Sequence, residues 1–395
     1  MKSAGPQFDR NAASQQYRAL LADGIIPFWL RHGVDREFGG VLSCMTEDGV
    51  VVSTEKYTWS QARFVWVVAA LYNRFEPRAE FLEIAGRAIG FLLANARDER
   101  GWFVFRTDRQ GRHLEGATSI YADCFVAYGL VEYYRATGEE RLLTLARDIL
   151  YRVRERVEEP DFAETAPYKL RPGRRTHAIP MMLTLLADEL AQTTGERSID
   201  AIAGEYAAQI LNSFVRKERK LLVEFLSHDY RELPSNEGTF VMPGHAIESM
   251  WFILHWARRH GEREMIRRAV EVIRWHLEAG WDPEFGGIFL GIDAEGQAPF
   301  LPNAEKKLWW PHTEALYALL LAHELTNEAW CLEWYERVHL WTFERFPIPG
   351  VGEWRQRLDR QGRPTTDVIA LPVKDPFHLP RAAILILQLL ERRSL

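Results

Sequence analysis

The chain has 395 residues, of which 47% are hydrophobic and 26% are charged, and this composition is that of an ordinary globular protein. The formal net charge of -6 gives no electrostatic reason to expect nucleic-acid binding, and no apolar run approaches the roughly 20 residues of a membrane-spanning helix. The three cysteines have no metal-binding or disulfide spacing and the N-terminus shows no apolar signal segment, so we expect a cytoplasmic protein with reduced thiols.

Helical periodicity recurs along the chain and predicts about twelve helices of two alternating kinds. Helices of the first kind are amphipathic, like 78–97, in which Glu80, Glu83 and Arg87 line one side. Helices of the second kind are apolar nearly all round, like 58–74, and such helices are buried beneath one-sided ones. The predicted helices span residues 10–32, 58–74, 78–97, 118–137, 139–158, 175–194, 196–216, 243–260, 262–280, 310–326, 328–346 and 376–393.

The connections between these helices also alternate. Links that follow an apolar helix are tight and carry glycines such as Gly138, Gly195 and Gly261, which are typical helix C-caps and make antiparallel neighbours. Links that follow an amphipathic helix are long, with turn and strand signals at 38–41, 100–105 and 285–289. Two of them share the sequence Asp-x-Glu-Phe-Gly-Gly, at 35–40 and 282–287. Loops of this length within a compact domain are usually functional.

The apolar helices begin at nearly constant spacing, near residues 58, 118, 175, 243, 310 and 376. A helical hairpin repeated six times predicts an all-α fold, an (α/α)6 barrel with six inner and six outer helices. Its long loops and short strands then lie on one face, together with the N-termini of the inner helices. No linker divides the chain, so we expect one domain over 1–395, with 1–8 as a flexible tail. An open helical solenoid is the alternative, but it would leave the very apolar last helix uncovered.

Polar and aromatic residues gather at the starts of the inner helices. Thr58 and Gln61 have the spacing of a capping box, which puts Arg63 at the rim of a buried helix. His245 and Glu248 are three residues apart and share one face of an otherwise apolar helix. The candidate site residues at this common mouth are Arg63, His177, His245, Glu248, Trp309, Trp310, His312, Glu314, His378 and Arg381.

Several of these residues have an alternative interpretation. Asp123 could be catalytic, but a buried carboxylate that pairs with Arg63 or caps a loop is the better fit. His177 could be a hydrogen-bonding core residue instead of a pocket residue. His312 and Glu314 are two residues apart, so their side chains need not converge.

The last two inner helices begin with further candidates. Trp309 and Trp310 could stack on a sugar ring or pack against neighbouring loops. Asp375 precedes a proline and is a natural N-cap for the final helix. His378 and Arg381, three residues apart, share a face of that helix.

The motifs that are absent narrow the chemistry. The chain contains no HExxH, no zinc-finger spacing, no GxSxG, no Walker A and no GxGxxG, so neither a metal nor a nucleotide cofactor is expected. Histidines on different helices, each near a carboxylate or an arginine, suit removal of a carbon-bound proton on one face and its return on the other. A helix N-terminus lowers the pKa of a nearby histidine, which helps a neutral imidazole to act as a base.

Four motifs in this order resemble those of the N-acylglucosamine 2-epimerase family: residues 56–63, 245–248, 307–314 and 377–381. The resemblance covers almost the whole chain. It implies an (α/α)6 barrel and metal-free epimerisation at C2 of an aldose through an enediolate. By the same resemblance, His245 and His378 form the acid/base pair, Arg63 polarises O1 and O2 of the sugar, and Glu248 is the carboxylate partner of His245.

The leading activity is interconversion of N-acetylglucosamine and N-acetylmannosamine. Residues 371–376 differ from the glycine- and lysine-rich approach of the animal enzymes, so 2-epimerisation of mannose, glucose or cellobiose and aldose–ketose isomerisation of mannose stay open. More distant alternatives are a glycoside hydrolase that uses Asp123 with Glu248 or Glu314, and a non-catalytic sugar-binding barrel.

Cofactor and partners follow from the same resemblance. No cofactor is expected. Some members respond to nucleotides, so ATP is considered as a modulator although the chain has no phosphate-binding loop. A small sugar is the expected partner, with no nucleic acid and no membrane. Family members often form homodimers, which makes a homodimer the oligomeric state to consider.

Overall fold

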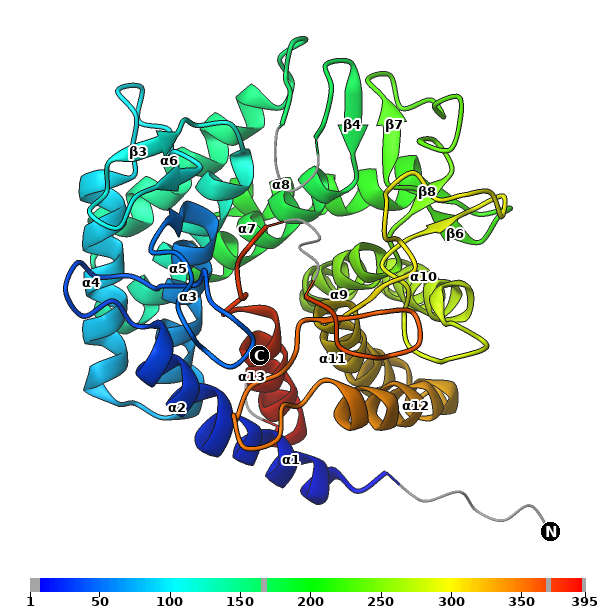
Figure 1. Cartoon of the computed structure of the whole chain (residues 1–395). Helices are drawn as coiled ribbons and strands as arrows, with labels where there is room; N and C mark the ends of the chain where they lie inside the picture. Colours follow the sequence, from blue (N-terminus) through cyan, green and yellow to red (C-terminus); the bar gives the residue numbers. More distant parts are fainter. Residues whose placement is uncertain (1–7, 165–168, 367–370, 393–395) are drawn as a thin grey trace.

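A computed structural model describes residues 8–164, 169–366 and 371–392 of the protein (Figure 1). The tail predicted at 1–8 lies outside these residues except for Phe8. The helices form a closed ring, and the first helix, α1 (Arg10–Ala19), lies beside the last, α13 (His378–Leu390). The side chain of Arg10 donates hydrogen bonds to the carbonyls of Leu389 and Leu390, so the two ends of the chain are joined at the bottom of the ring in this view.

All twelve predicted helical segments are present among the described residues. The first is a continuous stretch in which α1 passes into η1 (Leu20–Ile25), α2 (Ile26–Phe28) and η2 (Trp29–Gly33). The last segment, α13, is an inner helix. The other inner helices are α3 (Thr58–Ala70), α5 (Ile120–Thr137), α7 (Ala178–Thr194), α9 (Pro243–His260) and α11 (Trp309–Thr326). The other outer helices are α4 (Ala79–Asn95), α6 (Glu140–Arg156), α8 (Arg197–Gln209), α10 (Arg263–Gly280) and α12 (Ala329–Arg345), and α3 and α8 continue into η3 (Leu71–Phe75) and η4 (Ile210–Phe214).

The inner helices close a ring of their own. Each of α3, α5, α7, α9 and α11 packs against the next inner helix, and α13 packs against both α11 and α3. Each inner helix also packs mainly against one outer helix, with α1 covering α13. The open solenoid is therefore wrong, because the apolar last helix is covered by closure of the ring. The (α/α)6 barrel is confirmed.

Glycines end three of the inner helices as predicted. Gly138, Gly195 and Gly261 adopt left-handed φ values of 69°, 72° and 67°, which a side chain would disfavour. At each of these positions the backbone N–H bonds back to a carbonyl of the last helical turn. The tight link that follows turns the chain into the adjacent outer helix, which makes the helical hairpin.

Short antiparallel strands occupy the long loops, and four of them lead directly into inner helices: β1 into α3, β4 into α7, β8 into α9 and β10 into α11. Their pairing fixes the point at which each of these helices starts. The strand signals at 38–41, 100–105 and 285–289 form only single bridges, because paired glycines with φ near 80° turn the chain in the first and third. The strands are β1 (Lys56–Tyr57), β2 (Arg106–Thr107), β3 (His113–Glu115), β4 (Arg174–Thr176), β5 (Val215–Arg216), β6 (Leu221–Leu222), β7 (Phe225–Ser227), β8 (Phe240–Val241), β9 (Ile292–Asp293), β10 (Lys307–Leu308) and β11 (Arg357–Leu358).

The repeated Asp-x-Glu-Phe-Gly-Gly segments build the same local structure twice. In the first, Lys56 Nζ lies 3.0 Å from Asp35 and donates to the carbonyl of Gly39 at 2.7 Å. Arg109 pairs with the same aspartate at 3.0 Å.

In the second copy, Lys307 Nζ lies 3.1 Å from Asp282 and Arg360 lies 3.0 Å from it. We call Asp35–Lys56–Arg109 and Asp282–Lys307–Arg360 the two lysine anchors. Both lysines are in a strand that leads into an inner helix, so each anchor ties a long loop to a helix start.

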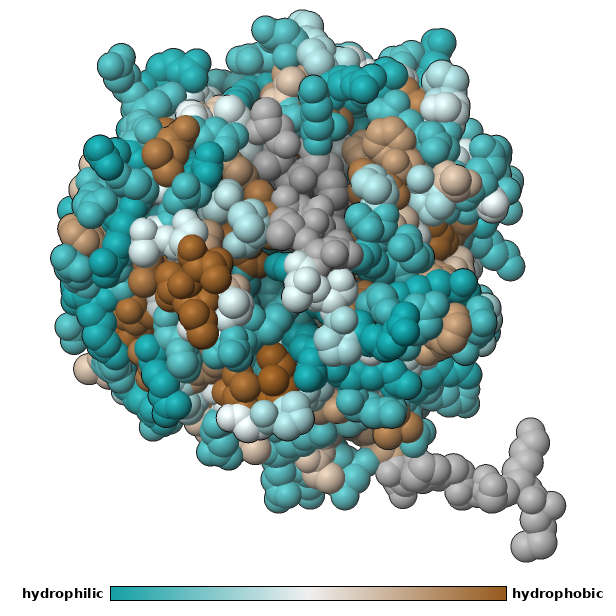
Figure 2. All heavy atoms as spheres, viewed as in Figure 1, coloured by the Kyte–Doolittle hydropathy of each residue, from teal (hydrophilic) through white to brown (hydrophobic). Residues whose placement is uncertain are grey.

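The loop face of the barrel is largely covered by hydrophilic side chains, with separate hydrophobic patches among them (Figure 2). Within the described residues, no helix combines the length and the apolar character that crossing a membrane requires.

Candidate active site

A cavity of about 930 Å³, including its open mouth, lies among the N-termini of the inner helices. Every inner helix contributes a side chain to it. Six of the ten residues predicted from the sequence line it: Arg63, His245, Glu248, Trp309, Trp310 and His378. The other lining residues are Trp59, Tyr121, Phe125, Ala178, Met181, Met182, Leu308, Arg357, Leu371, Val373 and Asp375.

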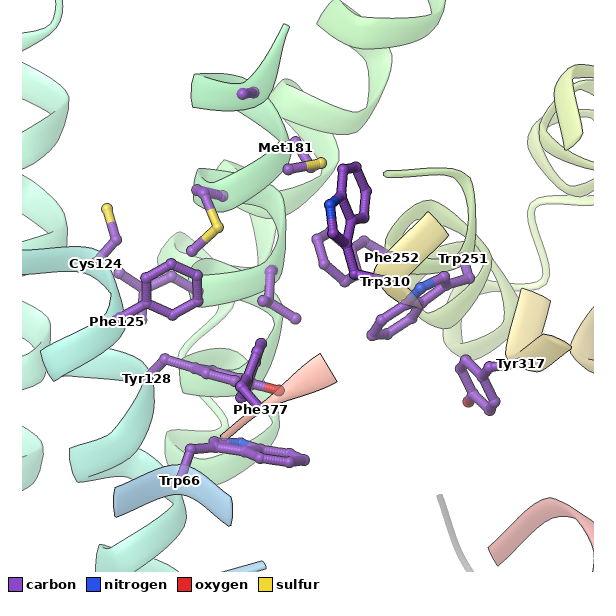
Figure 3. Close-up of a cluster of buried hydrophobic side chains, with 14 of the residues drawn as sticks. Trp66, Cys124, Phe125, Tyr128, Met181, Trp251, Phe252, Trp310, Tyr317 and Phe377 are labelled. Atoms are coloured by element: carbon purple, nitrogen blue, oxygen red, sulfur yellow. The ribbon is translucent and has the colours of Figure 1, made fainter. Parts of the chain in front are cut away.

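Apolar side chains form one wall of this cavity and the core behind it (Figure 3). Phe125 of α5 and Met181 of α7 lie across from Trp310 of α11. Trp66 stacks on Tyr128 with ring centres 5.1 Å apart, which makes a rigid aromatic layer in the core. A site of this kind favours ligands that present an apolar surface on one side.

His378 opens α13 and is held by two carboxylates. Its backbone N–H donates to Asp375 Oδ2 at 2.9 Å, but the prediction of Asp375 as the N-cap residue was wrong, because the helix starts at His378 with Phe377 as its N-cap. Its ring Nδ1 donates to Glu314 Oε1 at 2.8 Å, which leaves Nε2 as the nitrogen available to a ligand. Burial lowers the pKa of His378 to about 3 and outweighs the charge of Asp375, so the ring is neutral at physiological pH.

Arg381 lies one turn further along α13 and joins two carboxylates. Its guanidinium donates to Glu314 at 2.7 Å and to Glu248 at a shorter distance. Glu314 also accepts a hydrogen bond from Trp251 Nε1 at 2.8 Å. Both Glu314 and Arg381 are fully buried and absent from the cavity lining, so they hold His378 and Glu248 in place from behind.

The carboxylate beside His245 belongs to Glu224. Nδ1 of His245 lies 3.2 Å from Glu224 Oε2. Glu248, which was predicted to be this partner, binds Arg381 instead. The prediction was wrong because the guanidinium reaches Glu248 from α13, while Glu224 approaches His245 from a loop. Burial acts to lower the pKa of His245, but the charge and hydrogen bond of Glu224 outweigh it and raise the pKa.

Trp310 connects the two histidines. Its ring centre lies 5.2 Å from that of His245 and 5.6 Å from that of His378. Trp309 also contacts His378, with ring centres 6.2 Å apart. The two imidazoles thus line one cavity with an indole against both of them.

Arg63 places a positive charge in the same cavity. It pairs with Asp375 at 3.1 Å, and its guanidinium lies 4.1 Å from the centre of the Phe125 ring and 4.6 Å from that of Trp59. Pairing of Arg63 with Asp123 was considered from the sequence and is not observed. Burial lowers the pKa of Arg63, but its ordinary value is so high that it stays charged.

Asp123 is buried outside the cavity lining, where its Oδ1 accepts from the backbone N–H of Phe103 at 3.2 Å. It therefore caps a loop, which was one of the predicted roles. Burial raises its pKa to about 7. Of the three carboxylates considered for glycoside hydrolysis, only Glu248 lines the cavity, whereas that reaction needs two at the sugar.

Two predicted pocket histidines point elsewhere. His312 donates from Nδ1 to the carbonyl of Leu308 at 2.6 Å and accepts at Nε2 from Ile288 N–H at 2.9 Å. Both nitrogens are engaged in the protein core, so a role for His312 in binding substrate is not supported. His177 lies behind His245, fully buried, with Nε2 2.9 Å from Ser249 Oγ.

Two groups of side chains in the described part of the chain bring three metal-ligand atoms within 4.8 Å of one another: His177, Glu224 and His245, and Glu248, Glu314 and His378. In the second group the guanidinium of Arg381 contacts both carboxylates, and its positive charge opposes a cation. In the first, Glu224 Oε2 faces both ring nitrogens at hydrogen-bonding or ion-pair distance. Each group thus contains a histidine Nδ1 at hydrogen-bond distance from a glutamate oxygen.

Sequence reasoning missed Glu224 and the apolar wall. Glu224 is the single charge in the apolar run 221–226, and a lone carboxylate there is a usable signal of a buried polar contact. Met181 and Met182 gave no signal, because apolar residues on an inner helix look like any other core residues.

Comparison with known proteins adds an independent line of argument. The family model described as N-acylglucosamine 2-epimerase (GlcNAc 2-epimerase) matches residues 39–381. The N-acylglucosamine 2-epimerase of Bos taurus is 33% identical over 366 residues, which cover 91% of this chain and 87% of that protein.

Solved structures with the same fold include the cellobiose 2-epimerase of Bacillus thermoamylovorans B4167, with a TM-score of 0.83 at 20% identity over 96% of this chain and 99% of that one. A D-mannose isomerase structure has a TM-score of 0.81 at 17% identity, over 97% of this chain and 99% of that chain. These two likenesses concern the fold.

Proposed function

This chain belongs to the N-acylglucosamine 2-epimerase family, and from that premise we propose that it interconverts N-acetylglucosamine and N-acetylmannosamine. The observation that carries the proposal is the pair of histidines, His245 and His378, which line one cavity from different helices. Each ring has its Nδ1 on a carboxylate, so each offers Nε2 to a sugar. Two bases on different sides are what inversion at one carbon requires.

The proposed reaction begins with the open-chain aldose. One histidine takes the proton from C2, and the electron pair of the C2–H bond forms the C1=C2 bond of an enolate, with the acetamido nitrogen on C2, while O1 becomes negative. The other histidine then donates a proton to C2 from the opposite face, and the C1=O1 bond re-forms. A proton is lost on one side and gained on the other, so the reaction is balanced and needs no cofactor.

Arg63 is proposed to stabilise the negative O1 of the enolate. It is a charged group that lines the cavity, and it is steadied by Asp375 at 3.1 Å. A fixed positive charge in a partly water-excluded site stabilises a developing oxyanion more than it stabilises a neutral aldehyde. Trp309 and Trp310 are proposed to pack against the sugar.

The apolar wall supports an acylated amino sugar over a plain hexose. Phe125, Met181 and Met182 offer no strong hydrogen-bonding group to a hydroxyl but can bury the methyl of an acetamido group. The identity of 33% with an N-acylglucosamine 2-epimerase agrees with this choice. Epimerisation of cellobiose and isomerisation of mannose are the second candidates, because fold relatives carry those names, and epimerisation of mannose or glucose would use the same chemistry.

The decisive experiment is proton NMR of the purified protein with N-acetylglucosamine and N-acetylmannosamine in D2O. We expect each sugar to yield the other with solvent deuterium at C2. Mannose, glucose and cellobiose are run in parallel. A ketose product, or turnover of the plain sugars alone, would contradict the proposal.

His378→Asn and His245→Asn test the two-base mechanism. Each should lower the rate of epimerisation by about 10²- to 10⁴-fold, since each removes a proton-transfer group. His228→Asn is the matched control, because His228 is exposed and lies outside the cavity lining. A His378→Asn enzyme that epimerises at near the wild-type rate would contradict the two-base mechanism.

A further inference from the structure

We propose that Glu224 is the positioning residue of His245: its carboxylate holds the imidazole by Nδ1 and keeps Nε2 directed at the cavity. This inference rests on the proposed epimerase function and concerns how one of its two bases is prepared. Glu224 itself does not line the cavity. It acts through the histidine and not on the sugar.

The backbone of Glu224 is fixed from two sides. It lies between β6 and β7, and its N–H donates to the carbonyl of Phe240 in β8 at 2.9 Å. Its own carbonyl accepts from the N–H of His177 at 2.9 Å, at the start of α7. Since β8 leads into α9, which carries His245, Glu224 is held where the starts of two inner helices meet.

The side chain of Glu224 has a partner for each oxygen. It is 1% exposed, and Oε1 accepts from Thr176 Oγ at 2.8 Å. Oε2 lies 3.2 Å from His245 Nδ1 and 3.5 Å from His177 Nδ1. An ionised carboxylate only accepts hydrogen bonds, so His245 must carry a hydrogen on Nδ1, which fixes its tautomer whenever the ring is neutral.

His177 does not compensate the negative charge of Glu224, so this charge acts on His245. Burial lowers the pKa of His177, outweighing the opposite effect of Glu224, so this ring is neutral. No arginine or lysine in the described residues forms an ion pair with Glu224. The other groups that act on His245 are Glu248, which favours its protonated form, and Arg63, which opposes it.

The two bases are therefore prepared differently. Glu314 holds His378, but its charge is shared with Arg381, and the pKa of His378 falls to about 3 through burial. Glu224 serves His245 without a competing cation, and the pKa of that ring is raised. These surroundings favour a resting enzyme with one neutral and one protonated imidazole, which is the state that a two-base epimerase needs before it binds substrate.

Glu224→Gln tests this role, because the amide can still accept a hydrogen bond but has no charge. We expect epimerisation to fall about 10²-fold or more, as when a carboxylate that orients a catalytic histidine becomes an amide. The alkaline limb of the pH–rate profile should move to lower pH, since His245 loses its proton more readily.

A second readout separates positioning from loss of structure. His378 should still remove and return the C2 proton of the epimer that it serves, so exchange of that proton for solvent deuterium should persist while inversion falls. The ratio of exchange to inversion should rise in Glu224→Gln. Glu353→Gln is the matched control, because Glu353 is 2% exposed, accepts from Trp29 Nε1 at 3.0 Å and does not line the cavity.

The outcomes are distinct. Exchange and inversion that fall in equal proportion, with an unmoved alkaline limb, would overturn the role of Glu224 while leaving an epimerase in place. A wild-type protein that forms no 2-epimer contradicts the proposed function itself.

If Glu224→Gln does not fold, 15N NMR of histidine-labelled wild-type protein measures the tautomer and the pKa of His245. The His245→Asn variant assigns its signal. A proton on Nδ1 and a pKa above the ordinary 6.5 support the inference, and a pKa below it overturns it.

Discussion

In the proposed reaction, two residues of the same type perform opposite tasks because each has a different environment behind it. His378 and His245 both donate from Nδ1 to a glutamate. Behind His378 the glutamate is already paired with Arg381, whereas behind His245 the glutamate faces only neutral donors and the histidines. A carboxylate whose charge is compensated stabilises an imidazolium less. The distinction between acid and base is therefore made by the second partner of each glutamate.

The pH dependence of epimerisation follows from these two environments. The pKa of His378 is lowered to about 3, so protonation of this base does not limit activity near neutrality. Burial acts to lower the pKa of His245, but Glu224 raises it above its ordinary value, so this ring keeps its proton to higher pH than a free imidazole and loses it as the pH rises. We expect kcat/KM to fall on the alkaline side with an apparent pKa above 6.5, equally for both epimers because one equilibrium links them.

Initial rates in both directions across the pH range in which the protein stays folded check this prediction. The His228→Asn variant should give the same profile as the wild type. A profile that rises on the alkaline side would mean that both imidazoles must be neutral, and would contradict the assignment of one acid and one base.

At the scale of the helices, the site depends on how closely α9 and α11 approach each other. Gly244 lies in the first turn of α9, and a Cβ added there would be 2.5 Å from Cζ3 of Trp310 and 2.9 Å from Cβ of Pro311. Such distances are closer than carbon atoms tolerate. Glycine therefore allows the two helix starts to meet, which brings Trp310 against His245 and closes that side of the cavity.

Gly244→Ala should disturb activity more than folding. We expect a loss of about 1 to 3 kcal/mol in the free energy of unfolding from overpacking. We also expect a fall in kcat of roughly 10- to 100-fold, as Trp310 is displaced towards the ligand. Urea unfolding and NMR rate assays measure the two effects.

Gly90→Ala in α4 is the control, because a Cβ there meets nothing within 4 Å. It should leave activity unchanged and stabilise the protein by about 0.5 to 1 kcal/mol. Wild-type kcat in Gly244→Ala would show that the close approach of the helices is not needed.

At the scale of the whole molecule, closure of the ring is reinforced by the two lysine anchors. They tie the loops at 35–40 and 282–287 to the strands β1 and β10, which lead into α3 and α11. Both lysine side chains and both aspartates are fully buried. A buried ion pair is costly to break because the remaining charge loses its compensation.

Lys56→Met and Lys307→Met should each lower the free energy of unfolding by about 3 kcal/mol. This value is at the lower end of the cost of breaking a buried ion pair, because the arginine of the anchor still compensates the charge of the aspartate. The two losses should be similar, since the anchors are copies of one structure, and should add in the double variant, since they share no partner in the structure.

Urea midpoints measure these losses. Arg231→Met serves as the control, as its ion pair with Asp229 is exposed and screened by water and should contribute little to stability. A loss no larger than the control's in either lysine variant would show that the anchors do not carry stability.

Much of the fold could be predicted from the sequence because helix periodicity and caps are local properties. The helix at 243–260 was predicted with its observed bounds, and Gly138, Gly195 and Gly261 marked the tight turns. The alternation of apolar and amphipathic helices indicated which set lies inside. The strand signals were less reliable, since all three segments form only single bridges, and paired glycines turn the chain in two of them, 38–41 and 285–289.

Within the site, the sequence by itself determined which residue types stand at the mouth of the barrel. The positions of His245, His378 and Arg63 at inner helix starts follow from their place in the chain. The tertiary structure alone decided which carboxylate each histidine meets. Glu224 reaches His245 from a loop, Arg381 draws Glu248 away, and His312 turns to the carbonyl of Leu308. The physical reason is that a side chain pairs with its nearest compensating group in space, and only closure of the ring brings those groups together.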